Sequence, residues 1–439
     1  MLKENFKINK VLALFTAFVI TSGFTSCSTE NLNTSSTQKD STTQTNTQVT
    51  SQSTETLKAP TEFEVKSVVD SGLVTANTKF GLNLYSKILE QGKDKNIFIS
   101  PLSVSIALSM TFNGSDGTTK DDMAKALQFS NMTLDNVNAG NEILKRKLET
   151  VSSGVQVNIA NSLWGNKDFV FPSKFVEDNN KFYDAKLTSL DFSKKESVDA
   201  INKWVSDSTN KKIEKMVEQI DPATFLYLIN AIYFKGTWTD KFDKDLTTDA
   251  NFTLVDGKQK TVSMMERMGE FRYLEKAGEF QAIKLPYGES QEVSMYVFLP
   301  AKESNLTNFN KSLTSENLEA WFTQFKTSNG LLDLPKFKLE YELILNDSLK
   351  ALGMSSAFDS NANFTKLGGG FISEVKHKSF VDVNEEGTEA AAATSVAITK
   401  TSMPLEKPFN MIVDRPFVFA IVDGQTNSIL FMGNIVEPK

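Results

Sequence analysis

The spacing of apolar residues along the chain predicts a mixture of helices and short strands. Phe80, Leu84 and Ile88 recur at four-residue steps and Gly92 follows them, which is typical of an amphipathic helix and its end. Continuous apolar runs of strand length predict further strands at 96–101, 226–234, 293–299 and 337–341. Longer apolar or amphipathic stretches predict further helices at 104–112, 197–217 and 345–352.

The C-terminal end of the chain carries the clearest strand pair. Residues 417–422 and 429–432 are continuous apolar runs, joined by the polar segment 423–428. A hairpin that is apolar on both faces belongs inside a core. Because helices and strands are interspersed without regular alternation, the pattern favours one large α+β domain at about 75–439.

The N-terminal end reads as an export signal. Three lysines within the first ten residues precede an apolar run at 11–20, which is too short for a permanent membrane span. Small residues then precede Cys27, and the segment resembles a bacterial lipobox, whose cysteine becomes the lipidated first residue after cleavage. Phe24 stands where that pattern has an aliphatic residue, so cleavage without lipidation is the alternative. We expect a signal peptide at 1–27 and a secreted protein that is lipid-anchored through Cys27 at the outer face of the bacterial cell membrane.

The segment after Cys27 is polar. Ser and Thr make up about half of 28–58, with Gln and Asn filling most of the remainder, so this stretch is expected to be a disordered tether. Phe63, Val65, Val68 and Val69 are apolar enough to dock on the domain, which predicts an N-terminal extension that reaches residue 74.

Composition excludes several kinds of site. The chain has 47 Lys and Arg against 54 Asp and Glu, a net charge of −7 that gives no broad reason to bind nucleic acid. With one Cys and one His, it cannot assemble an ordinary zinc site or an intramolecular disulfide. Gly-rich phosphate loops and nucleophile-elbow motifs are absent from the sequence, so we expect no metal, no cofactor and no enzymatic activity, with His377 in a structural role.

The most unusual segment lies at 385–400. Alternate residues starting from Thr388 are small and then β-branched, whereas those starting from Glu389 are polar or small. A strand with this pattern can enter the middle of a sheet and find ladder partners on both sides. On propensity alone, the alanine run favours a helix instead.

Four segments, taken together, identify the folded part as resembling the serpin family of protease inhibitors. They lie in the family's order at 96–105, 228–238, 387–393 and 414–419. The resemblance implies an α+β fold of three β-sheets with eight or nine helices, and an exposed reactive loop near the C-terminus. It also implies a monomer that inhibits extracellular serine proteases, with cysteine proteases as a second class.

The resemblance implies a suicide mechanism. A target protease attacks the loop and forms a covalent acyl-enzyme, and the cleaved loop then inserts into the large sheet. The family spacing places the reactive bond between Thr401 and Ser402, and a loop one residue shorter would place it after Lys400. The implied hinge comprises Glu385, Glu386, Gly387, Thr388, Glu389, Ala390, Ala391, Ala392 and Ala393.

Further roles are implied residue by residue. Glu385 matches the acid at the base of the loop, and Lys336 matches its ion-pair partner. Trp238 matches a tryptophan packed where the loop inserts. The polar cluster that governs sheet opening is matched by Ser100, Ser103, Asn230 and His377.

Two other function classes stay open at this point. One is a non-inhibitory serpin that acts as a carrier, adhesin or chaperone at the cell surface. The other is a solute-binding lipoprotein. The extension at 59–76 carries a separate hypothesis, that it packs near the large sheet and retards spontaneous loop insertion.

Overall fold

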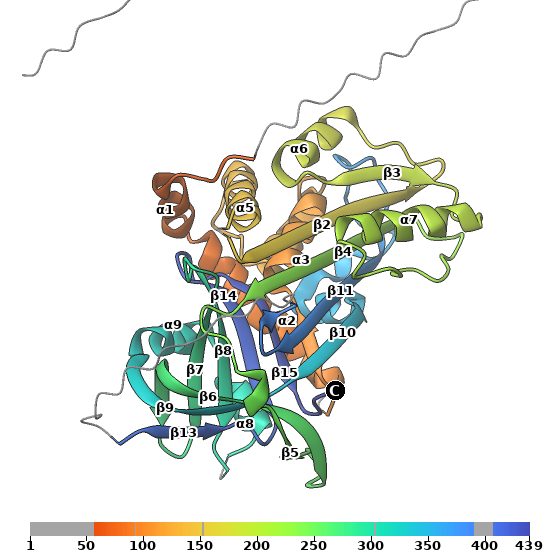
Figure 1. Ribbon diagram of the computed structural model, residues 1–439. Helices are drawn as coiled ribbons and strands as arrows, with labels where there is room; N and C mark the ends of the chain where they lie inside the picture. The colour runs from red at the N-terminus through yellow and green to blue at the C-terminus, as the bar shows by residue number, and fades with distance from the viewer. Residues whose placement is uncertain (1–56, 93, 152, 303, 390–406) are drawn as a thin grey trace, which may run out of the picture. The chain divides into compact units, whose positions relative to one another are not determined.

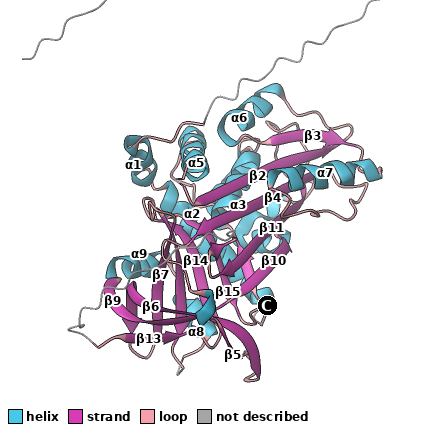
Figure 2. Ribbon diagram, in the orientation of Figure 1, coloured by secondary structure: helices cyan, strands magenta, loops and turns pink. Residues whose placement is uncertain are grey.

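The computed structural model describes residues 57–92, 94–151, 153–302, 304–389 and 407–439. The described residues form an α+β structure, as predicted (Figures 1 and 2). Its α-helices are α1 (Glu62–Asp70), α2 (Leu73–Gln91), α3 (Pro101–Phe112), α4 (Gly117–Ala126), α5 (Leu134–Glu149), α6 (Ser173–Tyr183), α7 (Lys195–Ser208), α8 (Leu306–Ser312), α9 (Ser315–Gln324) and α10 (Asn346–Leu349). Short helical turns add η1 (Lys244–Leu246), η2 (Lys350–Met354) and η3 (Ser355–Ala357).

The described strands pair into two sheets. The six-stranded sheet has the order β10 (Phe337–Ile344), β11 (Ile372–Asn384), β12 (Gly387–Thr388), β4 (Leu226–Thr237), β2 (Val155–Asn166) and β3 (Lys186–Leu190). The nine-stranded sheet has the order β1 (Ile97–Ile99), β15 (Ile429–Ile435), β14 (Phe417–Asp423), β8 (Val293–Pro300), β7 (Phe280–Tyr287), β6 (Gln259–Lys276), β9 (Lys326–Pro335) and β13 (Phe409–Ile412), with β5 (Thr248–Thr253) on β6.

The long strand β6 explains why two sheets stand where three were expected. Its first half pairs with β5 and its second half pairs with β7, while β9 pairs with it from Met264 to Tyr273. Because β6 pairs with β5 at one end, with β7 at the other and with β9 between them, strands that could otherwise count as two sheets form one continuous sheet. The ten helices within the described residues likewise exceed the expected eight or nine by a small margin.

Helix α3 is the buried helix predicted from its apolar surface. All twelve of its residues are buried, and it packs against β15, β4 and β2. The Ser100 side chain accepts a hydrogen bond from the Ser103 amide, and Pro101 occupies the first turn, where a missing N–H costs nothing. The helix therefore starts at a position that both residue types favour.

The predicted C-terminal hairpin is confirmed. Every residue of β14 and β15 is buried, and β14 lies between β8 and β15 in antiparallel register. The amphipathic helix around Phe80 and Leu84 is also confirmed as α2, which begins earlier than its pattern indicated, at Leu73.

The helix predicted at 197–217 ends early. Helix α7 stops at Ser208, and Asn210 and Lys211 both adopt positive φ angles, which reverse the chain. The residues beyond remain apolar because Ile213, Met216 and Val217 pack into a second core cluster beneath α7, and not because they continue the helix.

Helix α1 docks on the domain through Val68, but two of the four apolar residues expected to dock there, Phe63 and Val69, are exposed. It packs against α5 and α2, with Val68 buried and Phe63 81% exposed. Glu64 pairs with Arg146 of α5 at 2.8 Å. No helix within the described ranges is both long enough and apolar enough to cross a membrane.

Candidate functional site

Two parallel strands form the centre of the six-stranded sheet. β4 and β11 pair from Leu226 opposite Ile372 to Tyr233 opposite Phe380. Beyond that point the strands part, and the two-residue strand β12 lies between them in the strand order. It pairs antiparallel to both neighbours, with Thr388 opposite Val383 on one side and Gly236 on the other.

Gly387 fits this position because it lacks a side chain. Its φ is 147°, and a Cβ atom built there would lie 2.0 Å from the Gly236 carbonyl oxygen. Real Cβ atoms do not approach so closely, so any other residue here would force the hinge or β4 to shift.

Thr388 is completely buried next to an aromatic stack. Its hydroxyl lies 2.7 Å from the Tyr287 hydroxyl. The Tyr287 ring stacks on Trp238 with centroids 4.3 Å apart, and Trp238 Nε1 donates to the Asn384 carbonyl at 2.9 Å. The structure thus brings Trp238 against the segment that begins the hinge.

Glu385 and Lys336 form the ion pair that the sequence suggested. Lys336 Nζ lies 3.0 Å from the Glu385 carboxylate, and Thr247 Oγ1 donates to that carboxylate at 2.9 Å. Burial acts to raise the pKa of Glu385, but hydrogen bonds from the backbone, Lys336 and Thr247 outweigh it and lower the pKa below its usual value. This carboxylate is therefore held ionised at the base of the hinge.

Glu386 has two basic partners that sequence reasoning missed. Lys241 lies 2.7 Å from its carboxylate and Lys244 lies 2.9 Å from it. The hydrogen bond from Lys241 is the main reason that the pKa of Glu386 is lowered. Both lysines lie in the loop after β4. Its charged sequence contains no pattern that predicts that the loop folds back over the hinge.

Glu389 is the last hinge residue that the structure describes. Its amide donates to the Asp382 carbonyl at 2.8 Å, and its carboxylate contacts Lys212. Burial, together with the nearby Glu389 carboxylate, raises the pKa of Tyr233. Other predicted residues lie outside the described residues: Cys27, Ala390, Ala391, Ala392, Ala393, Lys400, Thr401 and Ser402.

The four predicted polar residues beneath the sheet meet in one buried cluster. His377 Nδ1 lies 2.6 Å from Asn230 Oδ1, and the Ser100 amide donates to His377 Nε2 at 3.2 Å. Asn230 Nδ2 donates to Ser103 and to Asn161 Oδ1, at 2.6 Å from the latter. All four predicted side chains have 0% exposure, and the cluster joins β4, β11 and α3.

These contacts fix the state of His377. Since Nε2 accepts the Ser100 amide proton, the ring is neutral and carries its proton on Nδ1, from which it donates to Asn230. Burial lowers the pKa of His377 to about 3. The histidine therefore serves as an uncharged bridge between the two central strands.

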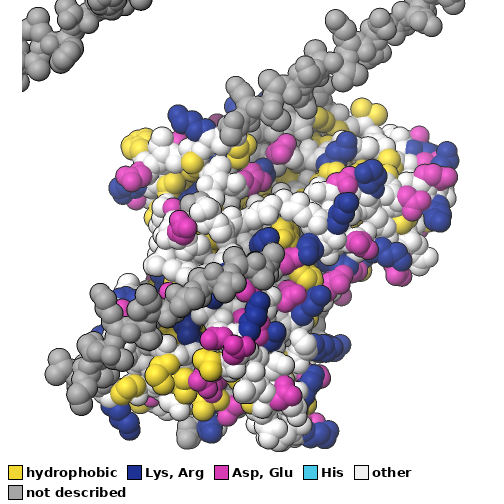
Figure 3. Space-filling model, in the orientation of Figure 1, with side chains coloured by type: hydrophobic (Ala, Val, Ile, Leu, Met, Phe, Trp, Pro, Cys, Tyr) yellow, Lys and Arg dark blue, Asp and Glu magenta, His cyan; other side chains and the backbone are white. Residues whose placement is uncertain are grey.

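Figure 3 shows one face of the molecule. On the described part of this face, acidic and basic side chains are interspersed. Among the described residues, no group of three or more His, Cys, Asp or Glu side chains is arranged to hold a metal ion.

Comparisons with known proteins identify the family. Residues 75–438 match the family model described as serpin (serine protease inhibitor). The leukocyte elastase inhibitor of Homo sapiens is 37% identical over 384 residues, which is 83% of this chain and 99% of that protein. An uncharacterized serpin-like protein of Methanosarcina acetivorans is 34% identical over 394 residues, which is 85% of this chain and 88% of that protein.

Solved structures agree. The native state of the thermophilic serpin Tengpin superimposes with a TM-score of 0.77 at 32% identity, covering 87% of this chain and 95% of that one. Human thyroxine-binding globulin with its hormone has a TM-score of 0.78 at 28% identity, covering 84% of this chain and all of that one. The α+β architecture, the central sheet with its hinge and the matched residues 75–438 place this chain in the serpin family, a family of protease inhibitors and not of enzymes.

Proposed function

We propose that this serpin is a suicide inhibitor of extracellular serine proteases, with cysteine proteases as a second target class. In this proposal, a protease acylates itself on the loop that follows Glu389. The cleaved loop then enters the central sheet between β4 and β11, carries the protease with it and distorts the protease active site.

The observation that carries the proposal is the pairing of β12 with both central strands. Gly387 and Thr388 already occupy the position of an inserted strand, antiparallel to each neighbour. Continued insertion would replace the parallel β4–β11 ladder, which has eight paired positions, by two antiparallel ladders. Antiparallel pairing is slightly more stable per residue, and the number of ladders doubles, so insertion is downhill once the loop is free to move.

The sequence of the loop suits that movement. Thr388 is buried in the sheet, and side chains in a strand alternate between its faces. Ala390 and Ala392 would therefore follow it to the same inner face, where small side chains meet little resistance as they pass between two strands. Larger β-branched residues come only after them.

We place the reactive bond at Thr401–Ser402, with cleavage after Lys400 as the alternative. A small residue before the bond suits elastase-like or subtilisin-like proteases, whereas Lys400 suits trypsin-like ones. The similarity to the leukocyte elastase inhibitor supports the first choice. We further propose that 1–27 is a bacterial signal peptide and that lipid on Cys27 anchors the monomer at the outer face of the cell membrane.

The test is incubation of the protein with trypsin-, elastase-, chymotrypsin- and subtilisin-like proteases, followed by denaturing electrophoresis and mass spectrometry. We expect a denaturant-resistant band at the summed mass, and the released C-terminal peptide will identify the reactive bond. Cleavage by every protease without a retained complex would contradict the mechanism and favour the non-inhibitory alternative, a carrier, adhesin or chaperone.

A matched pair of hinge variants sharpens this test. Thr388→Arg introduces a charge at a fully buried position, so the loop should be cleaved but should not insert, which converts the inhibitor into a substrate. Thr388→Val keeps the size and shape but loses the contact with Tyr287, and it should still form the complex. Equal behaviour of the two variants would argue against insertion at this position.

A further inference from the structure

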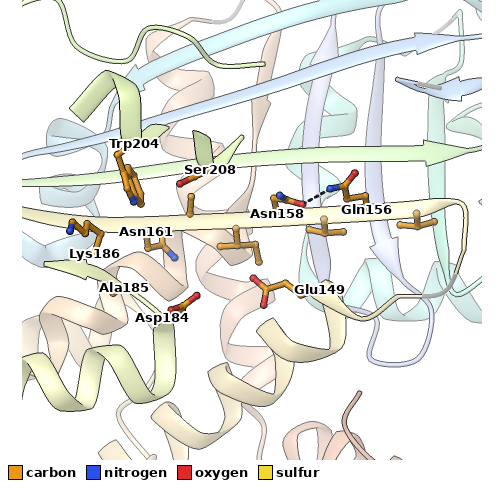
Figure 4. Close-up of a pocket in the computed structure, with 13 residues that line it drawn as sticks. Glu149, Gln156, Asn158, Asn161, Asp184, Ala185, Lys186, Trp204 and Ser208 are labelled. Carbon is orange, nitrogen blue, oxygen red and sulfur yellow. Dashed lines mark hydrogen bonds between the residues drawn. The ribbon is translucent and has the colours of Figure 1, made fainter. Parts of the chain in front are cut away.

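A cavity of about 610 Å³ wraps around the outer edge of β2, remote from the hinge in the chain (Figure 4). One wall is formed by Trp204 and Ser208 of α7, which covers one face of the sheet. The other wall is formed by Glu149 and Asp184, where α5 and α6 end. The cavity is therefore a groove with a strand edge as its floor.

That strand edge has no partner strand along the groove. β3 pairs with β2 only from Ser162 onward, whereas β4 pairs with the opposite edge from Val155 to Gly165. Since the Thr237 amide bonds to the Gly154 carbonyl, alternation of the antiparallel ladder turns the N–H and C=O groups of Val157 and Ile159 away from β4. Within the described part of the chain, no backbone bond to those groups is found.

A buried side chain also lacks a partner in this groove. Asn161 lines the cavity and is only 3% exposed, and its Nδ2 atom has no hydrogen-bond acceptor among the described residues. In Figure 4 the amide nitrogen points away from β2, toward the side where Asp184 and Ala185 lie. The orientation is fixed because Asn161 Oδ1 accepts a hydrogen bond from Asn230. Leaving a buried donor unsatisfied is unfavourable, and an acceptor in the groove would remove that cost.

We infer that this groove binds an extended peptide, which adds a short strand to β2 in line with β3. Only a peptide backbone offers alternating donors and acceptors at the spacing of Val157 and Ile159, and one of its carbonyls can accept from Asn161. The charges nearby balance: Lys145 lies 2.9 Å from Glu149 and 3.9 Å from Asp184, and Lys186 lines the same groove. The groove therefore recognises the backbone of the peptide, and peptides with uncharged side chains fit best.

The groove is joined to the cluster beneath the central sheet. Asn161 Oδ1 accepts a hydrogen bond from Asn230 Nδ2, and Asn230 Oδ1 is hydrogen-bonded to His377 Nδ1 on β11. A peptide that engages Asn161 Nδ2 therefore acts on the side chain that bridges β2 and β4. This link predicts that peptide binding changes the environment of the Asn230 side chain, although Asn230 does not line the groove.

The test uses isotope-labelled protein and the capped peptide acetyl-Val-Thr-Val-Thr-amide, followed by amide NMR shifts up to about 10 mM peptide. We expect saturable shifts of the Val157 and Ile159 backbone amides and of the Asn161 and Asn230 side-chain amides. The fully N-methylated peptide keeps the side chains but has no backbone donors, and it should leave these signals in place. Equal shifts with both peptides, or no saturable shift at Val157 and Ile159, would overturn the inference.

A pair of variants separates edge pairing from packing. Val157→Pro removes an outward N–H without breaking a bond to β4, while Val157→Ala loses similar packing but keeps the N–H. Binding should be lost in the first and retained in the second, and equal binding to both would contradict strand addition. If Val157→Pro does not fold, the N-methylated peptide still decides the question on the unaltered protein.

Discussion

Asn230 of β4 and His377 of β11 lie opposite each other in the central ladder, and their side chains join at 2.6 Å beneath the sheet. This contact bridges the two strands that must part if a loop is to enter between them. Because His377 must be neutral to accept the Ser100 amide, the bridge depends on pH.

The first prediction concerns that dependence. The folded pKa of His377 is about 3, against an unperturbed 6.5, so the unfolded chain binds one more proton than the folded chain between these values. The stabilisation is fully present above pH 6.5 and is lost as the pH falls toward 3. Between pH 6.5 and 5 we expect a loss of about 2 kcal/mol, measured from urea midpoints.

The control for this prediction is His377→Gln. Because His377 is the only histidine in the chain, the variant removes the one imidazole that titrates in this range. It should be less stable than the parent at pH 7, but its stability should change far less between pH 6.5 and 5. Parallel pH curves for the two proteins would show that His377 does not carry the effect.

The second prediction concerns the buried ion pair that ties α5 to the C-terminal hairpin. Lys147 Nζ lies 3.0 Å from the Asp423 carboxylate, and the two side chains are 6% and 1% exposed. Lys147→Met leaves a buried carboxylate without its cation and should cost about 3–5 kcal/mol in urea unfolding. Lys203→Met removes an exposed pair with Asp207 and should cost less than about 1 kcal/mol. Similar losses in both variants would mean that Asp423 is satisfied without Lys147.

Much of the fold could be predicted from the sequence wherever the pattern of apolar residues alone determines the type of element. The helix around Phe80 and the hairpin of β14 and β15 follow from periodicity and from apolar runs. The proximity of Glu385 to Lys336, and of Asn230 to His377, came from matching family motifs, because no local pattern places residues so far apart in the chain side by side.

Other features of the site and the fold cannot be predicted from the local sequence. Asn161 is one of several polar residues in β2, and only the register of β2 against β4 places its amide beside Asn230. Lys241 and Lys244 look like ordinary surface charges until the chain folds back over Glu386. The early end of α7 at Ser208 was missed because the apolar residues that follow serve a second core cluster.

The third prediction tests the fit of the hinge in the sheet. Gly387→Ala places a Cβ atom 2.0 Å from the Gly236 carbonyl oxygen, so β12 should be expelled and insertion impeded. Under the proposed mechanism, more inhibitor should then be cleaved for each protease trapped, by roughly tenfold if expulsion costs about 1.4 kcal/mol. Gly269→Ala, whose Cβ would meet nothing within 4 Å, should leave this ratio unchanged. An unchanged ratio in both variants would show that the hinge is not confined at Gly387.

The last prediction concerns helix α1 and the hypothesis that the N-terminal extension retards spontaneous loop insertion. Val68 is buried and lies near Leu73 and Gly140, where α1 meets α2 and α5, whereas Phe63 on the same helix is 81% exposed. Val68→Ser should detach α1 at a cost of about 1–2 kcal/mol, while Phe63→Ser should cost almost nothing. If docking of α1 restrains the sheet, Val68→Ser will lose protease inhibition faster than the parent on warming, and Phe63→Ser will match the parent. A half-life of inhibition that is the same in all three proteins would confine α1 to a local structural role.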